Sequence, residues 1–159
     1  MNKAFVKEDS GEQVLAPLPE MPAGVRNYVT PTGRQRMQRC LHELEQGAQA
    51  AHTRDIEQRI QYLRSRLETM EVVDASVHAG SERIYFGATV TYQDGAGEEH
   101  TVTLVGIDEA DAAQGRISWL SPVAQALLGA FEGDTVELDG VHGAEELAIL
   151  DVRYPQPDN

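Results

Sequence analysis

The side chains best suited to chemistry in this 159-residue chain are five histidines and a single cysteine. Metal-binding motifs place histidine or cysteine at short, fixed spacings, and the histidines here have none of these spacings. They stand at His42, His52, His78, His100 and His142. Cys40 has no partner for a disulfide, and because it adjoins Leu41 in an apolar helical stripe we interpret it as a buried, unreactive thiol. We expect neither a metal site nor a bound cofactor.

Adjacent acidic residues are the other group that could act chemically. Three such pairs fall in expected turns or strand ends, where solvated carboxylates are ordinary: Glu98–Glu99, Asp108–Glu109 and Glu145–Glu146. The string from Asp108 to Asp111 matches no ion-binding loop. The chain also lacks a glycine-rich phosphate loop and the Gly-x-Ser-x-Gly elbow of hydrolases. This pattern predicts a protein that is not an enzyme.

Charge is distributed unevenly along the chain. The net charge is −13, and residues 72–159 alone hold sixteen acids against three arginines. Because nucleic-acid phosphates need cations opposite them, this half is a poor match for bare DNA. Two interpretations stay open: the acids face a basic protein surface, or they only keep the domain soluble.

The hydropathy pattern predicts no membrane segment. The longest apolar runs are short, such as Ala124–Leu128 and Leu147–Leu150, whereas a span needs about 20 residues. The first residues lack the apolar core of a signal peptide. Together with the lone cysteine, these features predict a cytoplasmic protein.

The elements that would position a site follow an irregular tail. Residues 1–27 have neither a helical nor a strand period and include a stretch rich in Pro and Gly, which predicts a flexible tail. Thr30 and Pro31 then indicate a helix start, with Thr as N-cap and Pro in the first turn. Apolar residues recur at helical spacing in two sets: Met37, Leu41, Leu44, Ala48 and Ala51, then Ile56, Ile60, Leu63, Leu67 and Met70.

These two apolar stripes predict a short antiparallel coiled-coil hairpin over residues 28–71. Gly47 suits the end of the first helix and Thr53 the N-cap of the second. Each helix would have about 16 residues and extend roughly 24 Å. The hairpin is either a probe that reaches into a partner or a pair of helices folded against the rest of the chain, and the pattern leaves both open.

After a linker over residues 72–83, the apolar period changes to that of strands. Strands are expected at Ile84–Gln93, His100–Ile107, Arg116–Leu120, Thr135–Leu138 and Glu146–Tyr154. Ser121 and Pro122 indicate a helix start, and that helix should end near Gly129. About five strands and one helix predict an α+β domain over residues 84–155, with the helix packed on a mainly antiparallel sheet.

Several strings, in their order along the chain, resemble the Gre family of bacterial transcription factors. They are Tyr28-Val-Thr-Pro-Thr-Gly33, Ile60-Gln-Tyr-Leu-Arg-Ser-Arg-Leu67, Phe86-Gly-Ala-Thr-Val90, Leu104-Val-Gly-Ile-Asp-Glu109 and Ile117-Ser-Trp-Leu-Ser-Pro-Val-Ala-Gln-Ala-Leu-Leu-Gly129. The resemblance covers roughly Tyr28 to Tyr154. It implies an FKBP-like C-terminal domain that docks at the rim of the RNA polymerase secondary channel, with the coiled coil entering the channel.

The resemblance also implies which residues act. Docking would fall to Trp119, Leu120, Ser121, Pro122 and Asp108, with Leu120 where cleavage factors commonly have Asp. Cleavage factors place carboxylates at the coiled-coil tip to help hold a second Mg²⁺ ion, whereas the turn Gln46–Thr53 contains no Asp or Glu. The hairpin is also shorter than theirs and is similar to that of Rnk-type relatives. We therefore expect a regulator that does not stimulate cleavage and that meets nascent RNA or DNA only indirectly, through the elongation complex.

Two other functions remain as alternatives. An FKBP-like fold is compatible with a peptidyl-prolyl isomerase or chaperone, although fold alone is weak warrant for function. The apolar stripes are also compatible with a structural module that dimerises through its hairpin.

Overall fold

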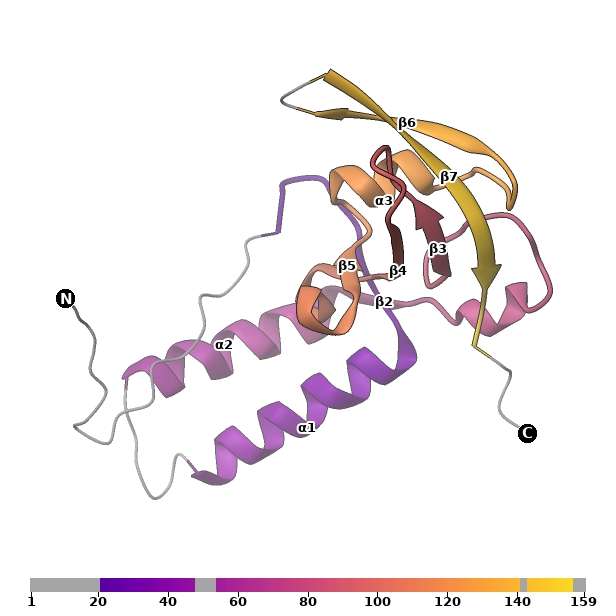
Figure 1. Cartoon of the computed structure of the whole chain (residues 1–159). Coiled ribbons are helices and arrows are strands. Elements are labelled where there is room, and N and C mark those ends of the chain that lie inside the picture. The colour runs from indigo at the N-terminus through magenta and orange to yellow at the C-terminus, as the bar shows by residue number, and fades with distance from the viewer. Residues whose placement is uncertain (1–20, 48–53, 141–142, 156–159) are drawn as a thin grey trace.

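The computed structural model shows an α+β protein with a pair of helices beside a five-stranded sheet (Figure 1). It describes residues 21–47, 54–140 and 143–155. The residues expected to form most of the flexible tail, and the turn between the two helices with Ala48, Ala51 and Thr53, lie outside this part of the chain. No helix in the described residues is long and apolar enough to cross a membrane.

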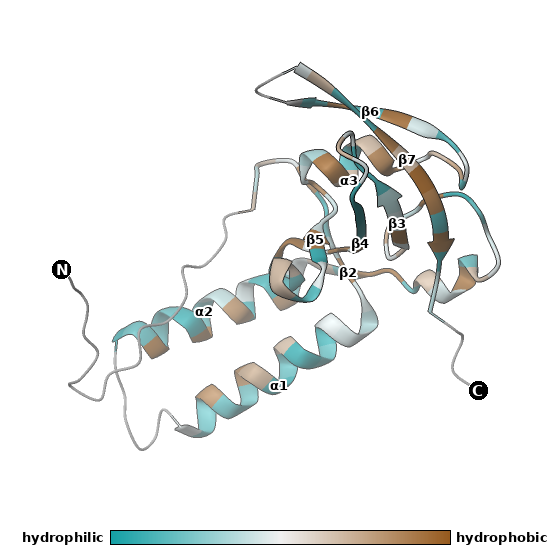
Figure 2. Ribbon diagram, in the orientation of Figure 1, coloured by the Kyte–Doolittle hydropathy of each residue, from teal (hydrophilic) through white to brown (hydrophobic). Residues whose placement is uncertain are grey.

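Helices α1 (Pro31–Gly47) and α2 (Arg54–Thr69) begin and end close to the expected positions. The N–H of Gly33 donates to Thr30 Oγ1 at 3.0 Å, so Thr30 caps α1 as its sequence position indicated. The two helices run antiparallel, and each carries hydrophobic residues among hydrophilic ones (Figure 2). Met37 on α1 and Ile60 and Leu63 on α2 are buried. The second stripe ends earlier than expected, because α2 stops at Thr69 and Met70 begins a strand.

Cys40 is exposed, so the expectation of a buried thiol was wrong. Each residue advances about 100° around a helix, and Cys40 is therefore turned well away from Leu41. A pair of helices buries only one stripe on each member, and Cys40 lies beside that stripe rather than on it.

A small parallel sheet joins the start of α1 to the end of α2. It pairs β1 (Asn27–Val29) with β2 (Met70–Val72), and Asn27 Nδ2 donates to the carbonyl of Arg66 at 3.0 Å. Beyond β2, the segment expected as a linker contains a short 3₁₀ helix, η2 (Ala75–His78). Strands of three residues carry too few side chains to show an alternating pattern, so no pattern in the sequence predicted this sheet.

The larger sheet has the order β5-β4-β3-β7-β6. Its strands are β3 (Thr89–Gln93), β4 (Glu99–Val105), β5 (Arg116–Ser118), β6 (Thr135–Gly140) and β7 (Gly143–Arg153). All neighbours are antiparallel except β4 and β5, which are parallel, so the mainly antiparallel expectation holds. Short 3₁₀ helices η3 (Ile107–Glu109) and η4 (Ala112–Gln114) connect β4 to β5.

Strand β3 starts five residues later than the predicted strand, at Thr89 rather than Ile84. Gly87 interrupts the extended backbone with a φ of 91°. A Cβ at Gly87 would lie 2.4 Å from the Cβ of Ala75, so a side chain at this position would collide with η2. Only glycine combines this backbone conformation with such a close approach.

Helix α3 (Pro122–Leu127) covers one face of the sheet, as expected. Ser121 Oγ accepts from the N–H of Ala124 at 3.3 Å, and Pro122 occupies the first turn. The core between helix and sheet consists of fully buried side chains, including Ile84, Leu104, Leu127, Leu147 and Ile149. Each such side chain contributes about 1.5–3 kcal/mol through burial.

Candidate functional site

The segment expected to dock, Trp119–Pro122, forms the tight connection between β5 and α3. The N–H of Trp119 donates to the carbonyl of Val105 at 2.8 Å, and the N–H of Leu120 donates to Ser118 Oγ at 3.1 Å. Trp119, Leu120 and Ser121 are half-buried, whereas Pro122 is exposed. The backbone of this segment is therefore held by the sheet while part of its side-chain surface faces solvent.

Trp119 belongs to an aromatic cluster with Tyr28 and Phe86. The ring centroid of Trp119 lies 5.0 Å from that of Tyr28 and 6.4 Å from that of Phe86, and Tyr28 and Phe86 are 5.7 Å apart. The tilted and edge-to-face arrangements are those that aromatic pairs prefer. Because Tyr28 comes from β1 and Trp119 follows β5, the cluster packs the small sheet against the larger one.

Asp108 lies in a different setting from the rest of the expected docking set. Tyr62 donates its hydroxyl hydrogen to Asp108 Oδ1, and Arg66 Nε lies 3.4 Å from Asp108 Oδ2. The Asp108 side chain is 6% exposed and that of Arg66 9%. A carboxylate so enclosed has little surface to offer a partner, so we assign Asp108 to the contact between α2 and η3 and leave it out of the proposed docking surface.

Tyr62 is part of the same buried group. The Arg66 guanidinium carbon stands 4.7 Å from the centroid of the Tyr62 ring. Burial, and then the hydrogen bond and charge of Asp108, raise the pKa of Tyr62 well above its ordinary value. The phenol therefore stays protonated and keeps donating to Asp108.

Glu109 fixes the start of α1. Its carboxylate accepts from the N–H of Thr30 at 3.0 Å, from the Thr30 hydroxyl, and from the N–H of Gly106 at 2.8 Å. A negative charge at this place also interacts favourably with the positive end of the α1 dipole. Asp108 and Glu109 are thus bonded within the chain, and the expectation that this acidic pair is a solvated turn was wrong.

We call the contacts made by Asp108 and Glu109 with Thr30, Tyr62 and Arg66 the junction. The sequence did not indicate it, because its members are separated by up to 79 residues and no local spacing connects them. A local signal was the Gly at position 33, where a Cβ would lie 2.0 Å from Glu109 Oε1. A glycine inside a helix, where it costs stability, often marks such a close approach.

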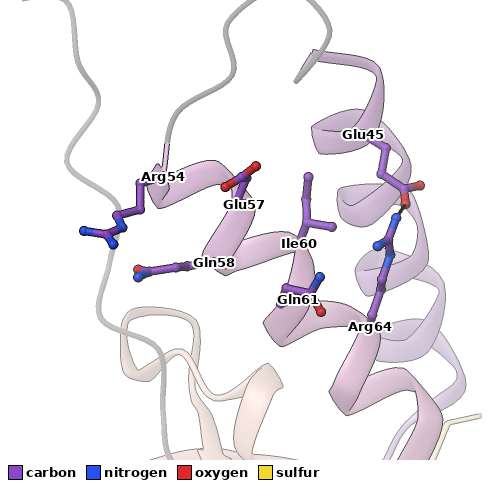
Figure 3. A pocket seen from close by; sticks show the side chains of 7 residues that line it. All are labelled: Glu45, Arg54, Glu57, Gln58, Ile60, Gln61 and Arg64. Carbon is purple, nitrogen blue, oxygen red and sulfur yellow. Dashed lines mark hydrogen bonds and ion pairs between the residues drawn. The ribbon is translucent and has the colours of Figure 1, made fainter.

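A groove lies at the end of the helical pair farthest from the sheet (Figure 3). Its volume is about 700 Å³, and its lining comes almost wholly from α2: Arg54, Glu57, Gln58, Ile60, Gln61 and Arg64, with Glu45 from α1. Glu45 and Arg64 form an exposed ion pair of 2.5 Å across the two helices. Of the described residues that line the groove, two are acids and two are bases, so neither charge is in excess among them.

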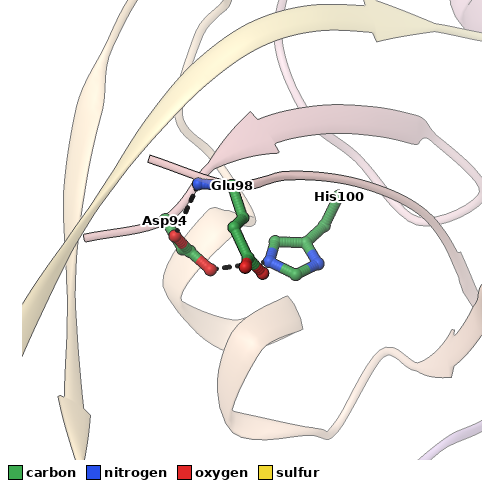
Figure 4. A group of neighbouring side chains, drawn as sticks. All are labelled: Asp94, Glu98 and His100. Atoms are coloured by element: carbon green, nitrogen blue, oxygen red, sulfur yellow. Dashed lines mark hydrogen bonds and ion pairs between the residues drawn. The ribbon is translucent and has the colours of Figure 1, made fainter. Parts of the chain in front are cut away.

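Asp94, Glu98 and His100 offer ligand atoms that all lie within 4.8 Å of one another (Figure 4). The sequence did not single them out, because spacings of four and two residues match no metal motif. The turn between β3 and β4 explains their approach. Asp94 Oδ1 accepts from the N–H groups of Ala96 and Glu98 at 2.9 and 3.0 Å, and Asp94 Oδ2 lies 2.7 Å from His100 Nε2.

The hydrogen bond from His100, followed by that from the N–H of Glu98, holds the pKa of Asp94 below its ordinary value of 3.8. A carboxyl with a depressed pKa stabilises the fold above pH 3.8, and this contribution is lost as the pH falls through the pKa of the folded state. Asp94→Asn should therefore lower the thermal midpoint at neutral pH, with the difference from the parent protein shrinking below pH 3.8. Thermal melts followed by circular dichroism across this range test the prediction, and a constant difference would refute it.

The fold and junction define an α+β protein in which a helical pair is fastened to a five-stranded sheet domain. The family model "Transcription elongation factor, GreA/GreB, C-term" matches residues 79–154. The chain is 37% identical to the transcription elongation factor GreB of Neisseria meningitidis over 163 residues, which span 87% of this chain and all of the relative. It is 42% identical to GreA of Nitratidesulfovibrio vulgaris over 111 residues, 68% of each chain.

Among solved structures, the GreA/GreB factor of Nitrosomonas europaea is 27% identical, with a TM-score of 0.42, and the match covers 81% of this chain and all of that one. The chain belongs to the GreA/GreB family of transcription elongation factors.

Proposed function

We propose that this protein binds RNA polymerase at the rim of the secondary channel and regulates transcription without stimulating transcript cleavage. The 37% identity to a complete GreB, over the whole length of that relative, is the observation that carries the polymerase partnership. The sheet domain supplies the docking surface, and the helical pair points towards the channel. We also propose that residues 28–71 act as a truncated coiled-coil hairpin, and that residues 84–155 form an FKBP-like domain joined to it by the linker 72–83.

The length of the helical pair supports the proposal that the protein does not stimulate transcript cleavage. Helix α1 has 17 residues and α2 has 16, so each extends roughly 25 Å. The match to the Neisseria GreB has 163 aligned positions and spans all of that relative. It includes 87% of this 159-residue chain, so about two dozen positions of the relative have no counterpart here. A shorter projection withdraws its tip from the polymerase active site.

The chemistry of the turn points the same way. Cleavage at a two-metal site needs carboxylates within reach of the second ion. Residues 46–53 contain no Asp or Glu, and the nearest acids in the sequence are Glu45 and Asp55. Glu45 is already paired with Arg64. The protein would therefore occupy the channel entrance without supplying a metal ligand.

The proposed docking surface consists of Leu120, Ser121 and Pro122, with Trp119 behind them in the aromatic cluster. Apolar anchors that become buried on binding often dominate an interface, and the acidic surroundings of the sheet domain would favour a basic partner. Leu120 replaces the Asp that is common at this position in cleavage factors, so burial of an aliphatic side chain would take over from a polar contact.

Replacement of the anchor should weaken polymerase binding. We expect Leu120→Ala to raise the dissociation constant for core RNA polymerase about tenfold or more, because a hot-spot truncation costs at least 1–2 kcal/mol. Val77→Ala is the matched control, since Val77 is an aliphatic side chain that is 76% exposed on η2, outside the proposed surface. Titration of fluorescently labelled protein against core polymerase measures both constants. Equal affinities for parent and Leu120→Ala, with unchanged thermal melts, would remove Leu120 from the interface.

A further inference from the structure

A second cavity, of about 430 Å³, lies where the first turns of α1 meet the larger sheet. Its lining is rich in hydroxyls and guanidinium groups: Thr30, Thr32, Arg36, Thr89, Thr103, Arg116 and Arg153, together with Gly87, Val105, Glu109, Tyr154 and Pro155. None of the residues proposed for docking lines it. This volume lies within the range of about 300–1,000 Å³ that is usual for small-ligand sites.

Four of the lining residues form one row across the sheet. Arg116 on β5 pairs with Thr103 on β4, Thr103 pairs with Thr89 on β3, and Thr89 pairs with Arg153 on β7. Residues that are directly opposite on neighbouring strands point to the same face. Their sequence neighbours Val90 and Leu104 are fully buried in the core, so the row Arg-Thr-Thr-Arg lies on the other face. At its centre the two threonine hydroxyls are 2.9 Å apart.

These arginines lie together in a half of the chain that is otherwise strongly acidic. Residues 72–159 contain only three arginines beside sixteen acids, and two of the three line this cavity. Arg36 of α1 adds a third guanidinium. Among the described residues that line the cavity, Glu109 is the one acid, and its carboxylate already accepts from Thr30 and Gly106.

Two of the three guanidinium groups, those of Arg36 and Arg153, are available to a ligand, and the third is fixed within the chain. Arg153 pairs with Asp151 through Nε at 2.7 Å, and its side chain is 63% exposed. Within the described residues, no ion pair engages Arg36 or the terminal nitrogens of Arg153. Arg116 is held in place, since Nε donates to the carbonyl of Glu109 and Nη1 to Gln114, while Nη2 stays 3.6 Å from Asp111. One fixed and two exposed arginines thus surround the hydroxyl pair.

We propose that this cavity binds the di- or triphosphate group of a small ligand, either free or as part of a nucleotide. Arginine forks match phosphate oxygens bidentately, and threonine hydroxyls donate to the same oxygens. Strands about 4.8 Å apart place Arg116 and Arg153 roughly 14 Å from each other at the backbone, so long side chains reaching inward meet over a linked chain of phosphates. The proposal does not depend on polymerase binding.

Isothermal titration of the full chain with tripolyphosphate, at low salt and without Mg²⁺, tests this proposal. We expect one saturable site per chain. Arg36→Gln and Arg153→Gln should each weaken binding about tenfold, as expected for loss of one charge-assisted contact. Arg39→Gln is the matched control, because Arg39 is an exposed arginine one turn along α1 that does not line the cavity. Both cavity variants remove exposed side chains, so their thermal melts should match that of the control.

Further titrations identify the source of the phosphate. Equal affinity for ATP and tripolyphosphate would assign recognition to the phosphate chain, and tighter binding of ATP would add contacts to the nucleoside; either outcome supports the site. Absence of saturable binding overturns it, as does an equal loss in Arg39→Gln, which would reduce the effect to general charge attraction. Tighter binding of a ribooligonucleotide lacking a 5′-triphosphate than of either phosphate compound would also overturn it, in favour of an RNA surface.

Discussion

Asp108→Ala should lower the free energy of unfolding by about 3–5 kcal/mol, because it removes the carboxylate that faces the buried Arg66 guanidinium. The two side chains are 6% and 9% exposed, so water cannot replace the lost partner. Tyr62 loses its acceptor in the same substitution. Urea denaturation followed by circular dichroism gives the change, and the midpoint should shift without a large change in slope.

The ion pair between Glu45 and Arg64 supplies the control for this prediction. It too joins an acid to an arginine, but it links α1 to α2 rather than α2 to η3, and its side chains are 36% and 52% exposed. Glu45→Ala should therefore cost at most about 1 kcal/mol. If Asp108→Ala were as mild as Glu45→Ala, the junction would not be a buried ionic contact, and the assignment of Asp108 to it would fail.

Gly33→Ala should destabilise the protein even though alanine favours helices. In an ordinary helix interior this substitution stabilises by roughly 0.5–1 kcal/mol. Here the new Cβ would lie 2.0 Å from Glu109 Oε1 and 2.7 Å from Glu109 Cγ, which forces the carboxylate away from Thr30 and Gly106. We expect a net loss of about 2–3 kcal/mol, from the hydrogen bonds to a charged group that are broken.

Gly47→Ala is the matched substitution at the other end of the same helix. Among the described residues, no atom lies within 4 Å of a Cβ built at Gly47, and its φ is not positive. Gly47→Ala should therefore be neutral or slightly stabilising in the same denaturation experiment. If Gly33→Ala and Gly47→Ala changed the free energy of unfolding with the same sign and by the same amount, Glu109 would not approach α1 as described.

Local signals in the sequence were sufficient for the elements with strong periodicity or capping. Thr30 and Pro31 located the start of α1, and Ser121 and Pro122 located α3. The interval between the strands expected at Ile84–Gln93 and His100–Ile107 located the β3–β4 connection. Each of these features depends on residues within a few positions of one another. Helix capping and hairpin turns are local in this sense, so the sequence alone could predict them.

The junction and the cavity could not be predicted in this way, because their members meet only through the tertiary fold. Asp108 and Glu109 look like an ordinary acidic turn until α1 and α2 are placed beside them. The row from Arg116 to Arg153 depends on strand register, and the order β5-β4-β3-β7 is not the order of the chain. For Cys40, the error came from treating a neighbour of an apolar stripe as part of it.

The proposed function sets a mechanical requirement that the junction meets. A projection that enters a channel must keep its direction relative to the surface that docks. Here Glu109 holds the start of α1, and Asp108 holds the last turns of α2 through Tyr62 and Arg66. Trp119 links the proposed docking segment to Tyr28 at the base of the same pair. We infer that docking and the direction of the helices are coupled through these contacts.

The most direct test uses backtracked elongation complexes with RNA labelled at its 5′ end. The tagged full chain is added, complexes are recovered on the tag, and the RNA is resolved on a gel together with the unbound fraction. We predict that the complexes are recovered and that their RNA is cleaved no faster than by intrinsic hydrolysis. A cleavage-competent GreB should compete for the polymerase and so reduce the recovery. Shortened RNA above the intrinsic rate, or no recovery at low salt, would contradict the proposal of a polymerase regulator that does not stimulate cleavage.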